Sequence, residues 1–232
     1  MQIQREYYQP LAAAYIRGKL HALASSGHPE LFKPELDELN DGQIAQLLAL
    51  AQSHELRLHR FKRSMELPRV QKVLGILKGL QPLNLLDIGT GRGAFLWPLL
   101  DTLPYLPVTC VDRLDYRVAD LQTMHTGGIT RLEATHGDVT ALPFVDHSFD
   151  VVTMLEVLEH VPETRLALSE VCRVAQRFVL FSVPSQADDN PEHIHLFTQH
   201  QLGLLLAEQG LKRIHFEYVL NHMIVIAGIE HS

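Results

Sequence analysis

The stretch LLDIGTGRGAF, residues 85–95, decides the fold of this chain. An apolar run containing one acid leads into glycines at every second position, and the glycines lead into a further apolar segment. Glycine lets the backbone turn tightly and approach a ligand closely. The free N–H groups at the start of a helix favour a negative group. The pattern therefore predicts a strand, a ligand-binding turn and a helix, in that order.

On both sides of this turn, short apolar segments alternate with longer amphipathic ones. We predict strands at 84–88, 108–112, 131–136, 149–155 and 178–183, with helices at 94–103, 115–125, 163–175 and 199–209. Such alternation is typical of a parallel sheet covered by helices on both faces. Two last apolar segments, 214–220 and 223–229, are joined by a link too short for a parallel crossover, which predicts a hairpin.

The predicted fold is thus α/β: a doubly wound, seven-stranded, mostly parallel sheet with a terminal antiparallel hairpin, plus an N-terminal helical cap. We divide the chain into a helical cap or accessory segment, 1–80, and a ligand-binding domain, 81–232. Apolar spacing and turn residues predict three helices in the cap. The first carries Leu11, Tyr15, Leu20 and Leu23 and ends before Gly27, the second is capped by Asn40 or Asp41, and the third carries Val70, Val73, Leu74 and Leu77 and ends at Gly79.

Composition is that of an ordinary globular protein, with 46% hydrophobic and 20% charged residues. No stretch approaches the ~18 consecutive apolar residues that span a bilayer. The first residues lack the order of a secretory signal, so we expect a cytoplasmic protein. Cys110 and Cys172 are far apart in apolar surroundings and are expected to be free, buried thiols.

The net charge of −7 is unevenly spread, because residues 57–78 are basic and contain one acid, Glu66. Such a run forms either a solvated helix face or a patch that receives an anionic substrate or the carboxylate of a cofactor. One short basic stretch on an acidic chain is a poor footprint for duplex DNA. We therefore do not expect duplex DNA as a partner, and RNA stays an alternative.

Two cofactor classes use a glycine turn of this kind. Dinucleotide enzymes use G-x-G-x-x-G/A, which Gly89, Gly91 and Ala94 satisfy. Enzymes of the doubly wound class that use S-adenosylmethionine (SAM) have an acid followed by G-x-G-x-G. Asp87 and the glycines at 89, 91 and 93 satisfy that pattern fully.

Asp112 ends the second predicted strand. An acid at the carboxyl edge of the sheet can bind both hydroxyls of a ribose, which either cofactor class requires. The alternative is that Asp112 caps the following helix, as Asp often does at such positions.

Three further segments follow at strand ends: HGDVTALPF at 136–144, DHSFDVV at 146–152 and EVLEHVP at 156–162. Together with the glycine turn, in this order, they resemble the class I SAM-dependent methyltransferases of the type 11/12-like group. The resemblance covers about 81–229. It implies a methyltransferase that moves a methyl group from SAM, its cofactor, to an acceptor.

The resemblance also implies which residues bind SAM: Asp87, Gly89, Gly91, Gly93, Asp112, Asp138, Val139, Leu155 and Glu156. The glycines would shelter the methionine part and the ribose. Asp87 would steady the turn or meet the methionine amino group, and Asp112 would hold the ribose.

In the same comparison, Asp138 would accept a hydrogen bond from the adenine amine, while the N–H of Val139 meets a ring nitrogen. Leu155 and Glu156 would lie beside the methionine end. One departure is visible, because RVAQRF at 173–178 replaces the Pro-Gly-Gly type of turn that is common before the fifth strand. This departure puts the shape of that loop in doubt.

A general base is needed only if the acceptor carries a proton, as a hydroxyl does. His160 is the candidate catalytic residue, because imidazole titrates near neutral pH. The alternative for His160 is a residue at a helix start that is hydrogen-bonded to the backbone.

A metal site is a further alternative. Glu156, Glu159, His160 and His195 resemble the divalent-metal ligands of small-RNA 2′-O-methyltransferases, and such residues suit a first-row metal. We expect no metal, because metal-free small-molecule methyltransferases carry the same residues.

We predict a small-molecule acceptor, since the acidic catalytic half would repel nucleic acid. The competing functions are a metal-dependent RNA 2′-O-methyltransferase, an NAD-dependent oxidoreductase and a non-catalytic SAM-binding protein. We further expect the N-terminal helices to cover the cofactor and acceptor, with residues 57–78 near the opening.

Overall fold

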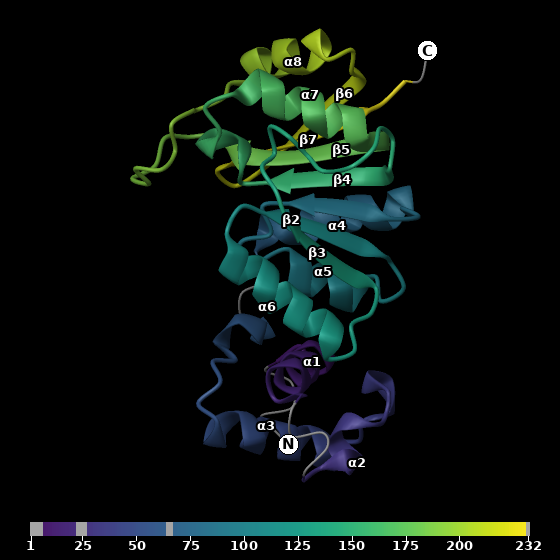
Figure 1. The fold of residues 1–232 in the computed structure, drawn as a ribbon. Coiled ribbons are helices and arrows are strands. Elements are labelled where there is room, and N and C mark those ends of the chain that lie inside the picture. Colours follow the sequence, from purple (N-terminus) through teal and green to yellow (C-terminus); the bar gives the residue numbers. More distant parts are fainter. Residues whose placement is uncertain (1–6, 22–26, 64–66, 231–232) are drawn as a thin grey trace.

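The computed structural model describes residues 7–21, 27–63 and 67–230. One sheet has the strand order β3-β2-β1-β4-β5-β7-β6 (Figure 1). The strands are β1 Leu85–Ile88, β2 Val108–Asp112, β3 Leu132–His136, β4 Phe149–Leu155, β5 Ala175–Pro184, β6 Lys212–Val219 and β7 His222–Gly228. Strands β1 to β5 are parallel, whereas β7 is antiparallel to both β5 and β6. The predicted fold class is confirmed.

The order of the strands also fixes where a ligand can bind. From β1 the chain proceeds outward to β2 and β3, then returns to the other side of β1 with β4. At such a switch point the loops after neighbouring strands diverge and leave a crevice at the carboxyl ends. The ends of β1 and β4 border this crevice.

The helices are α1 Gln9–Lys19, α2 Pro29–Phe32, α3 Asp41–Ser53, α4 Pro68–Leu80, α5 Leu96–Thr102, α6 Asp115–Thr126, α7 Thr164–Val174 and α8 Gln199–Glu208. Short 3-10 turns are η3 Leu36–Glu38, η4 His59–Phe61 and η6 Leu158–His160. Among the helices within the described ranges, none has the length and apolar character needed to cross a membrane.

Successive residues of a strand point to opposite faces of the sheet, and here each face has its own core. Leu85 and Val151 pack with α4, α5 and α6 on one face. Their neighbours Leu86 and Val152 pack with α7 and α8 on the other. All four side chains are fully buried. Burial on both faces accounts for the continuous apolar runs that predicted the strands.

The N-terminal helices attach to the sheet domain through α6. In Figure 1, α1 and α3 lie beyond α6, on its side away from the sheet. The close approach of α1 and α6 depends on two glycines, which have no Cβ. A Cβ at Gly127 would collide with the Ala14 carbonyl, and a Cβ at Gly18 would collide with Thr123. By contrast, α4 packs against α5, β6 and β7.

The three helices predicted in the cap are present. The first is shorter than expected, because α1 ends at Lys19; Leu23 lies outside the described residues. Asn40 caps α3, its Oδ1 accepting a hydrogen bond from the N–H of Gln43 at 3.0 Å. The third helix, α4, extends one residue beyond Gly79.

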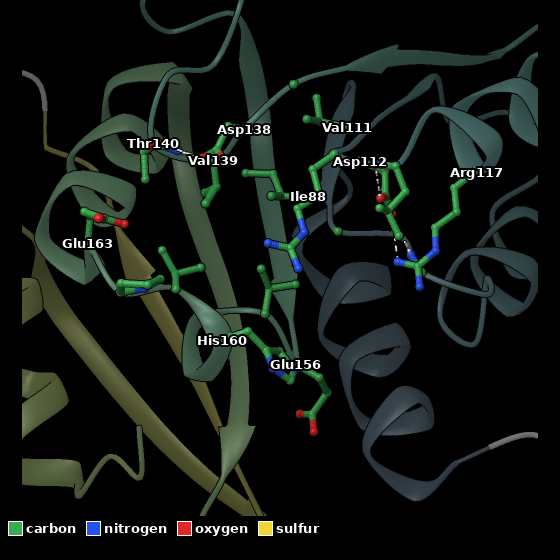
Figure 2. Close-up of a pocket in the computed structure, with 18 of the residues that line it drawn as sticks. Ile88, Val111, Asp112, Arg117, Asp138, Val139, Thr140, Glu156, His160 and Glu163 are labelled. Carbon is green, nitrogen blue, oxygen red and sulfur yellow. Dashed lines mark hydrogen bonds and ion pairs between the residues drawn. The ribbon is translucent and has the colours of Figure 1, made fainter. Parts of the chain in front are cut away.

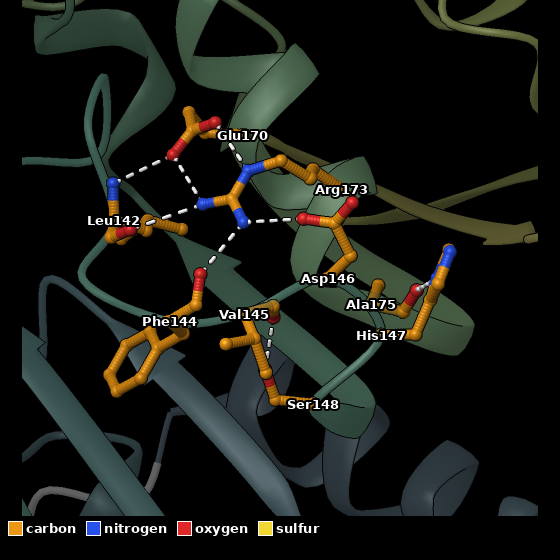
Figure 3. A network of polar contacts seen from close by, with 9 residues as sticks. All are labelled: Leu142, Phe144, Val145, Asp146, His147, Ser148, Glu170, Arg173 and Ala175. Atoms are coloured by element: carbon orange, nitrogen blue, oxygen red, sulfur yellow. Dashed lines mark hydrogen bonds and ion pairs between the residues drawn. The ribbon is translucent and has the colours of Figure 1, made fainter.

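The Pro-Gly-Gly type of turn before the fifth strand is absent here, because α7 continues directly into β5. Arg173, at the end of α7, donates to the carbonyl oxygens of Phe144 at 2.7 Å and Leu142 at 3.1 Å (Figure 3). It also donates to both carboxylate oxygens of Glu170 at 2.7 Å and to Asp146 at 2.8 Å. Arg173 therefore holds the loop between β3 and β4 where the usual turn is missing.

Candidate active site

The glycine turn after β1 has the backbone geometry that its sequence predicts. The φ angles of Gly89, Gly91 and Gly93 are +70°, +61° and +83°, the left-handed region that favours glycine. A Cβ at Gly89 would collide with Val157, and a Cβ at Gly93 would enter the ring of Trp97. At Gly91 the nearest heavy atom is 3.7 Å away from the position of such a Cβ. The outer two glycines are thus required by packing, whereas a Cβ at Gly91 would make only ordinary van der Waals contacts.

Two adjoining cavities open along the carboxyl edge of the sheet. The large cavity, of about 510 Å³, extends from the ends of β1 and β2 to the loop after β3 and to η6 (Figure 2). The small cavity, of about 180 Å³, lies between α4, the glycine turn and the ends of β4 and β5. Gly89, Gly91 and Glu156 line both cavities, so the two lie next to each other.

Most of the predicted site residues meet at these cavities. The large cavity is lined by Gly89, Gly91, Asp112, Asp138, Val139, Glu156 and His160. The small cavity is lined by Asp87, Gly89, Gly91, Leu155 and Glu156. Gly93 is in the lining of neither cavity and contributes through the shape of the turn.

Asp112, at the end of β2, has a carboxylate that the fold already holds in place. It accepts hydrogen bonds from the N–H of Gly91 at 3.2 Å and of Leu114 at 3.0 Å. Arg117 on α6 donates a third at 3.3 Å. Leu114, and not Asp112, is the N-cap residue of α6. Asp112 therefore links the glycine turn to α6 at the wall of the large cavity. Its partner Arg117 was not predicted, because no sequence pattern indicates this pair.

Asp138 and Val139 lie on one side of Ile88 and Val111, with Asp112 on the other (Figure 2). The Oδ1 atom of Asp138 accepts from the N–H of Thr140 at 2.8 Å and from its hydroxyl at 2.6 Å. These two bonds lower the pKa of Asp138 and keep it ionised. Oδ2 is the oxygen that remains for a ligand.

Asp87 is almost completely buried within β1 and reaches the small cavity. Burial raises the pKa of Asp87 to about 7, although a hydrogen bond of 2.9 Å from the hydroxyl of Thr153 acts in the opposite direction. No basic side chain of the described residues forms an ion pair with Asp87. A cationic ligand would therefore stabilise its carboxylate.

Glu156 stands where β4 ends and adopts a φ of +56°, which is uncommon for a residue with a side chain. Its N–H donates to the Ser182 carbonyl at 2.9 Å, and the Ser182 hydroxyl donates back to its carboxylate at 2.6 Å. His222 Nε2 lies 3.1 Å and Arg69 Nε 3.7 Å from its carboxylate oxygens. Surrounding contacts thus enforce a strained backbone, a feature that clusters at functional sites.

The four residues of the metal alternative do not converge. Glu156 faces Ser182 and His222, as described above. His195 Nε2 lies 3.2 Å from the Val161 carbonyl oxygen. His160 lies in η6, lines only the large cavity of the two, and has Nδ1 2.8 Å from the Glu192 carbonyl oxygen.

The basic stretch 57–78 is largely neutralised by acids of the sheet domain. Arg60 pairs with Asp120 at 2.6 Å, Arg63 with Asp101 at 2.9 Å, and Lys72 with a glutamate of β6. Through these ion pairs, the basic stretch 57–78 contacts the sheet domain. Further along the same stretch, the small cavity is lined by Arg69.

Comparisons with known proteins agree with this geometry. Residues 86–180 match the family model of the methyltransferase domain. A demethylmenaquinone methyltransferase of Staphylococcus aureus strain JH9 is 32% identical over 108 residues, which make up 46% of this chain and 43% of the relative. The chain therefore matches less than half the length of the curated relatives.

Two solved structures share the fold at low sequence identity. A SAM-dependent methyltransferase from Aquifex aeolicus has a TM-score of 0.58 and 20% identity, over 70% of this chain and 97% of that chain. The CurJ carbon methyltransferase has a TM-score of 0.60 and 15% identity, over 92% and 70%. The family model, the strand order and the glycine turn agree: residues 86–180 are similar to the methyltransferase domain, and the chain shares the fold of these solved methyltransferase structures.

Proposed function

We propose that this chain transfers a methyl group from SAM to a small-molecule acceptor. The observation that carries the proposal is the glycine turn at the switch point, with Asp112 and Asp138 lining the same large cavity. Binding of an adenosine requires an acid for the ribose and an acid for the adenine amine. It also requires a turn whose backbone can approach the ligand closely.

In this proposal the adenosine occupies the large cavity and the methionine end occupies the small one. Asp112 holds the ribose hydroxyls, while Oδ2 of Asp138 and the N–H of Val139 meet the adenine. Asp87, with its raised pKa, gains a partner in the methionine ammonium. Arg69, in the lining of the small cavity, is the cation that supports the methionine carboxylate.

Bound SAM supplies an electrophilic methyl group on a sulfonium. The contribution of the chain is to orient the two reactants and to keep water away from them. Val70, Val73 and Phe95 give the small cavity an apolar wall beside Leu155. Glu156 lies at the junction of the cavities, so it is placed to take a proton from an acceptor hydroxyl. The role of His160 as base is less favoured, because His160 lines only the large cavity of the pair.

The acidic sheet domain favours a small acceptor over nucleic acid, because its negative charge would repel a phosphate backbone. The relative that methylates demethylmenaquinone supports an aromatic, quinol-like compound as the first to test. The proposed location is the cytoplasm, on the composition of the chain.

The proposal is tested by incubating the chain with methyl-labelled SAM, quinols, other small metabolites and an RNA with a free 3′ end. We expect label in the small-molecule fraction, and loss of that label in Glu156→Gln if the accepting atom is a hydroxyl. Transfer to RNA alone would replace the proposed acceptor class. No transfer to any class, despite tight binding of SAM, would favour a non-catalytic binding protein.

A further inference from the structure

Three side chains that can ligate a metal lie together beside the large cavity, and one of them, His160, lines it. Glu159 and His160 lie in η6, and His193 lies in the segment between β5 and α8. One donor atom from each of the three lies within 4.8 Å of the other two. We propose that Glu159, His160 and His193 bind one divalent transition-metal ion, a site independent of the methyl-transfer chemistry proposed above.

Glu159 is the side chain that most requires such a partner. It has no exposed surface, and neither carboxylate oxygen makes a hydrogen bond with another described residue. A buried carboxyl group without a partner is costly, and buried charges are normally paired or coordinate a metal. Burial raises the pKa of Glu159 to about 8, with the charge of Glu156 adding to the effect. A cation at this place would stabilise the ionised form of the Glu159 carboxylate and take the place of its proton.

The two imidazoles are oriented as metal ligands usually are. His160 Nδ1 lies 2.8 Å from the Glu192 carbonyl oxygen, and His193 Nδ1 lies 2.9 Å from a carboxylate oxygen of Asp188. Metal-binding histidines almost always donate the second ring N–H to such an acceptor, which fixes the tautomer and the ring. These contacts leave both Nε2 atoms as the donors. The Nε2 atom of His193 already lies 4.0 Å from the Glu159 carboxylate.

The distances fit an ion after a small adjustment. Ligands at ~2.0–2.2 Å from a tetrahedral ion lie roughly 3.4 Å from one another. The three donors therefore need to close by up to about 1.4 Å, a movement of the size that side-chain rotation produces. This ligand set differs from the one considered from the sequence, because His193 takes the place of His195 and Glu156 takes no part.

The ligand chemistry selects the class of ion. Two imidazoles and one carboxylate suit Zn²⁺, Co²⁺ or Mn²⁺, whereas Ca²⁺ and Mg²⁺ prefer sets made only of oxygen ligands. Three protein ligands leave at least one coordination position open. His160 lines the large cavity, and the ion would join the segment that carries His193 to η6 at that wall.

The experiment uses the full chain, freed of metal with a chelator and dialysed. Calorimetric titration with Zn²⁺ should give one ion per chain, and Co²⁺ should produce the visible d–d absorption of a site with nitrogen ligands. The decisive pair is His193→Ala and His195→Ala, two histidines of one His-x-His segment. The first variant should lose the ion, and the second should bind it like the original chain.

Two more variants show how strongly each residue contributes to metal affinity, and they separate loss of binding from misfolding. Glu159→Gln keeps the size of the buried side chain and should abolish binding while the far-UV circular dichroism stays unchanged. Asp188→Ala removes only the partner of His193 and should weaken binding about 10–100-fold. The proposal is overturned if the metal-free original chain takes up no stoichiometric ion. It is equally overturned if His193→Ala and His195→Ala have the same affinity for Zn²⁺.

Discussion

Replacing Asp112 by alanine removes a carboxylate that accepts three hydrogen bonds. The donors are the N–H of Gly91 at 3.2 Å, the N–H of Leu114 at 3.0 Å and Nη1 of Arg117 at 3.3 Å. A bond to a charged group contributes ~1.5–3 kcal/mol, and a typical bond ~1. The three bonds are long, and the side chain of Arg117 is 29% exposed, so water replaces part of the loss. We therefore expect the free energy of unfolding to fall by about 2–3 kcal/mol in total.

For a chain of this size, ~1 kcal/mol lowers Tm by about 2–4 °C. The Tm of Asp112→Ala should accordingly fall by about 4–12 °C, and the variant should remain folded at room temperature. Scanning calorimetry of the two chains measures this shift.

The loss of ligand affinity is the functional part of the same prediction. Two charge-assisted bonds to the ribose hydroxyls are worth about 2–4 kcal/mol after replacement by water. The Kd for S-adenosylhomocysteine should therefore rise roughly 30–1,000-fold. Isothermal titration below the Tm of the variant measures it. Asp115→Ala is the matched control, because Asp115 begins α6 and its side chain is 93% exposed. A folded Asp112→Ala with unchanged affinity would show that Asp112 only holds the turn to α6.

Three more predictions follow from single contacts. Gly93→Ala should lower the free energy of unfolding, measured by urea denaturation, by more than ~2 kcal/mol, since φ is +83° and the Cβ would enter the ring of Trp97; an unchanged urea midpoint would contradict the geometry of the turn. Arg173→Ala should cost about 2–3 kcal/mol of stability and weaken S-adenosylhomocysteine binding by loosening the loop that carries Asp138, and normal values of both would refute this. The pKa of Asp87 is raised to about 7 in the folded chain and is ~3.9 when unfolded, so its ionisation destabilises the fold progressively between about pH 4 and 7. The stability gained by Asp87→Asn, measured by urea denaturation, should grow through that window, whereas a gain independent of pH would count against the raised pKa.

The sequence was sufficient for the sheet because its signals are local. The strands 108–112 and 149–155 were predicted to the residue, each being an apolar run bounded by turn or polar residues. The fifth strand begins at Ala175, three residues earlier than predicted, since no turn separates it from α7. The contacts of Arg173 with the preceding loop are tertiary, so no local pattern indicates them.

The residues of the candidate site, too, could be predicted only in part from the sequence. Asp87, Asp112 and Asp138 follow from their places at strand ends, where the topology brings them to one edge. Their partners come from elsewhere in the chain. Arg117 lies on the following helix, and His222 begins the last strand, 66 residues after Glu156. A single sequence has no signal for such pairs, because they depend on how the elements pack.

The central claim is that the cavities at this switch point bind the adenosine and methionine parts of SAM. Isothermal titration of the full chain with S-adenosylhomocysteine, and separately with NAD⁺, tests it most directly. The account predicts one S-adenosylhomocysteine per chain, with binding that weakens in Asp112→Ala, and no saturable binding of NAD⁺. Equal or tighter binding of NAD⁺ would contradict it.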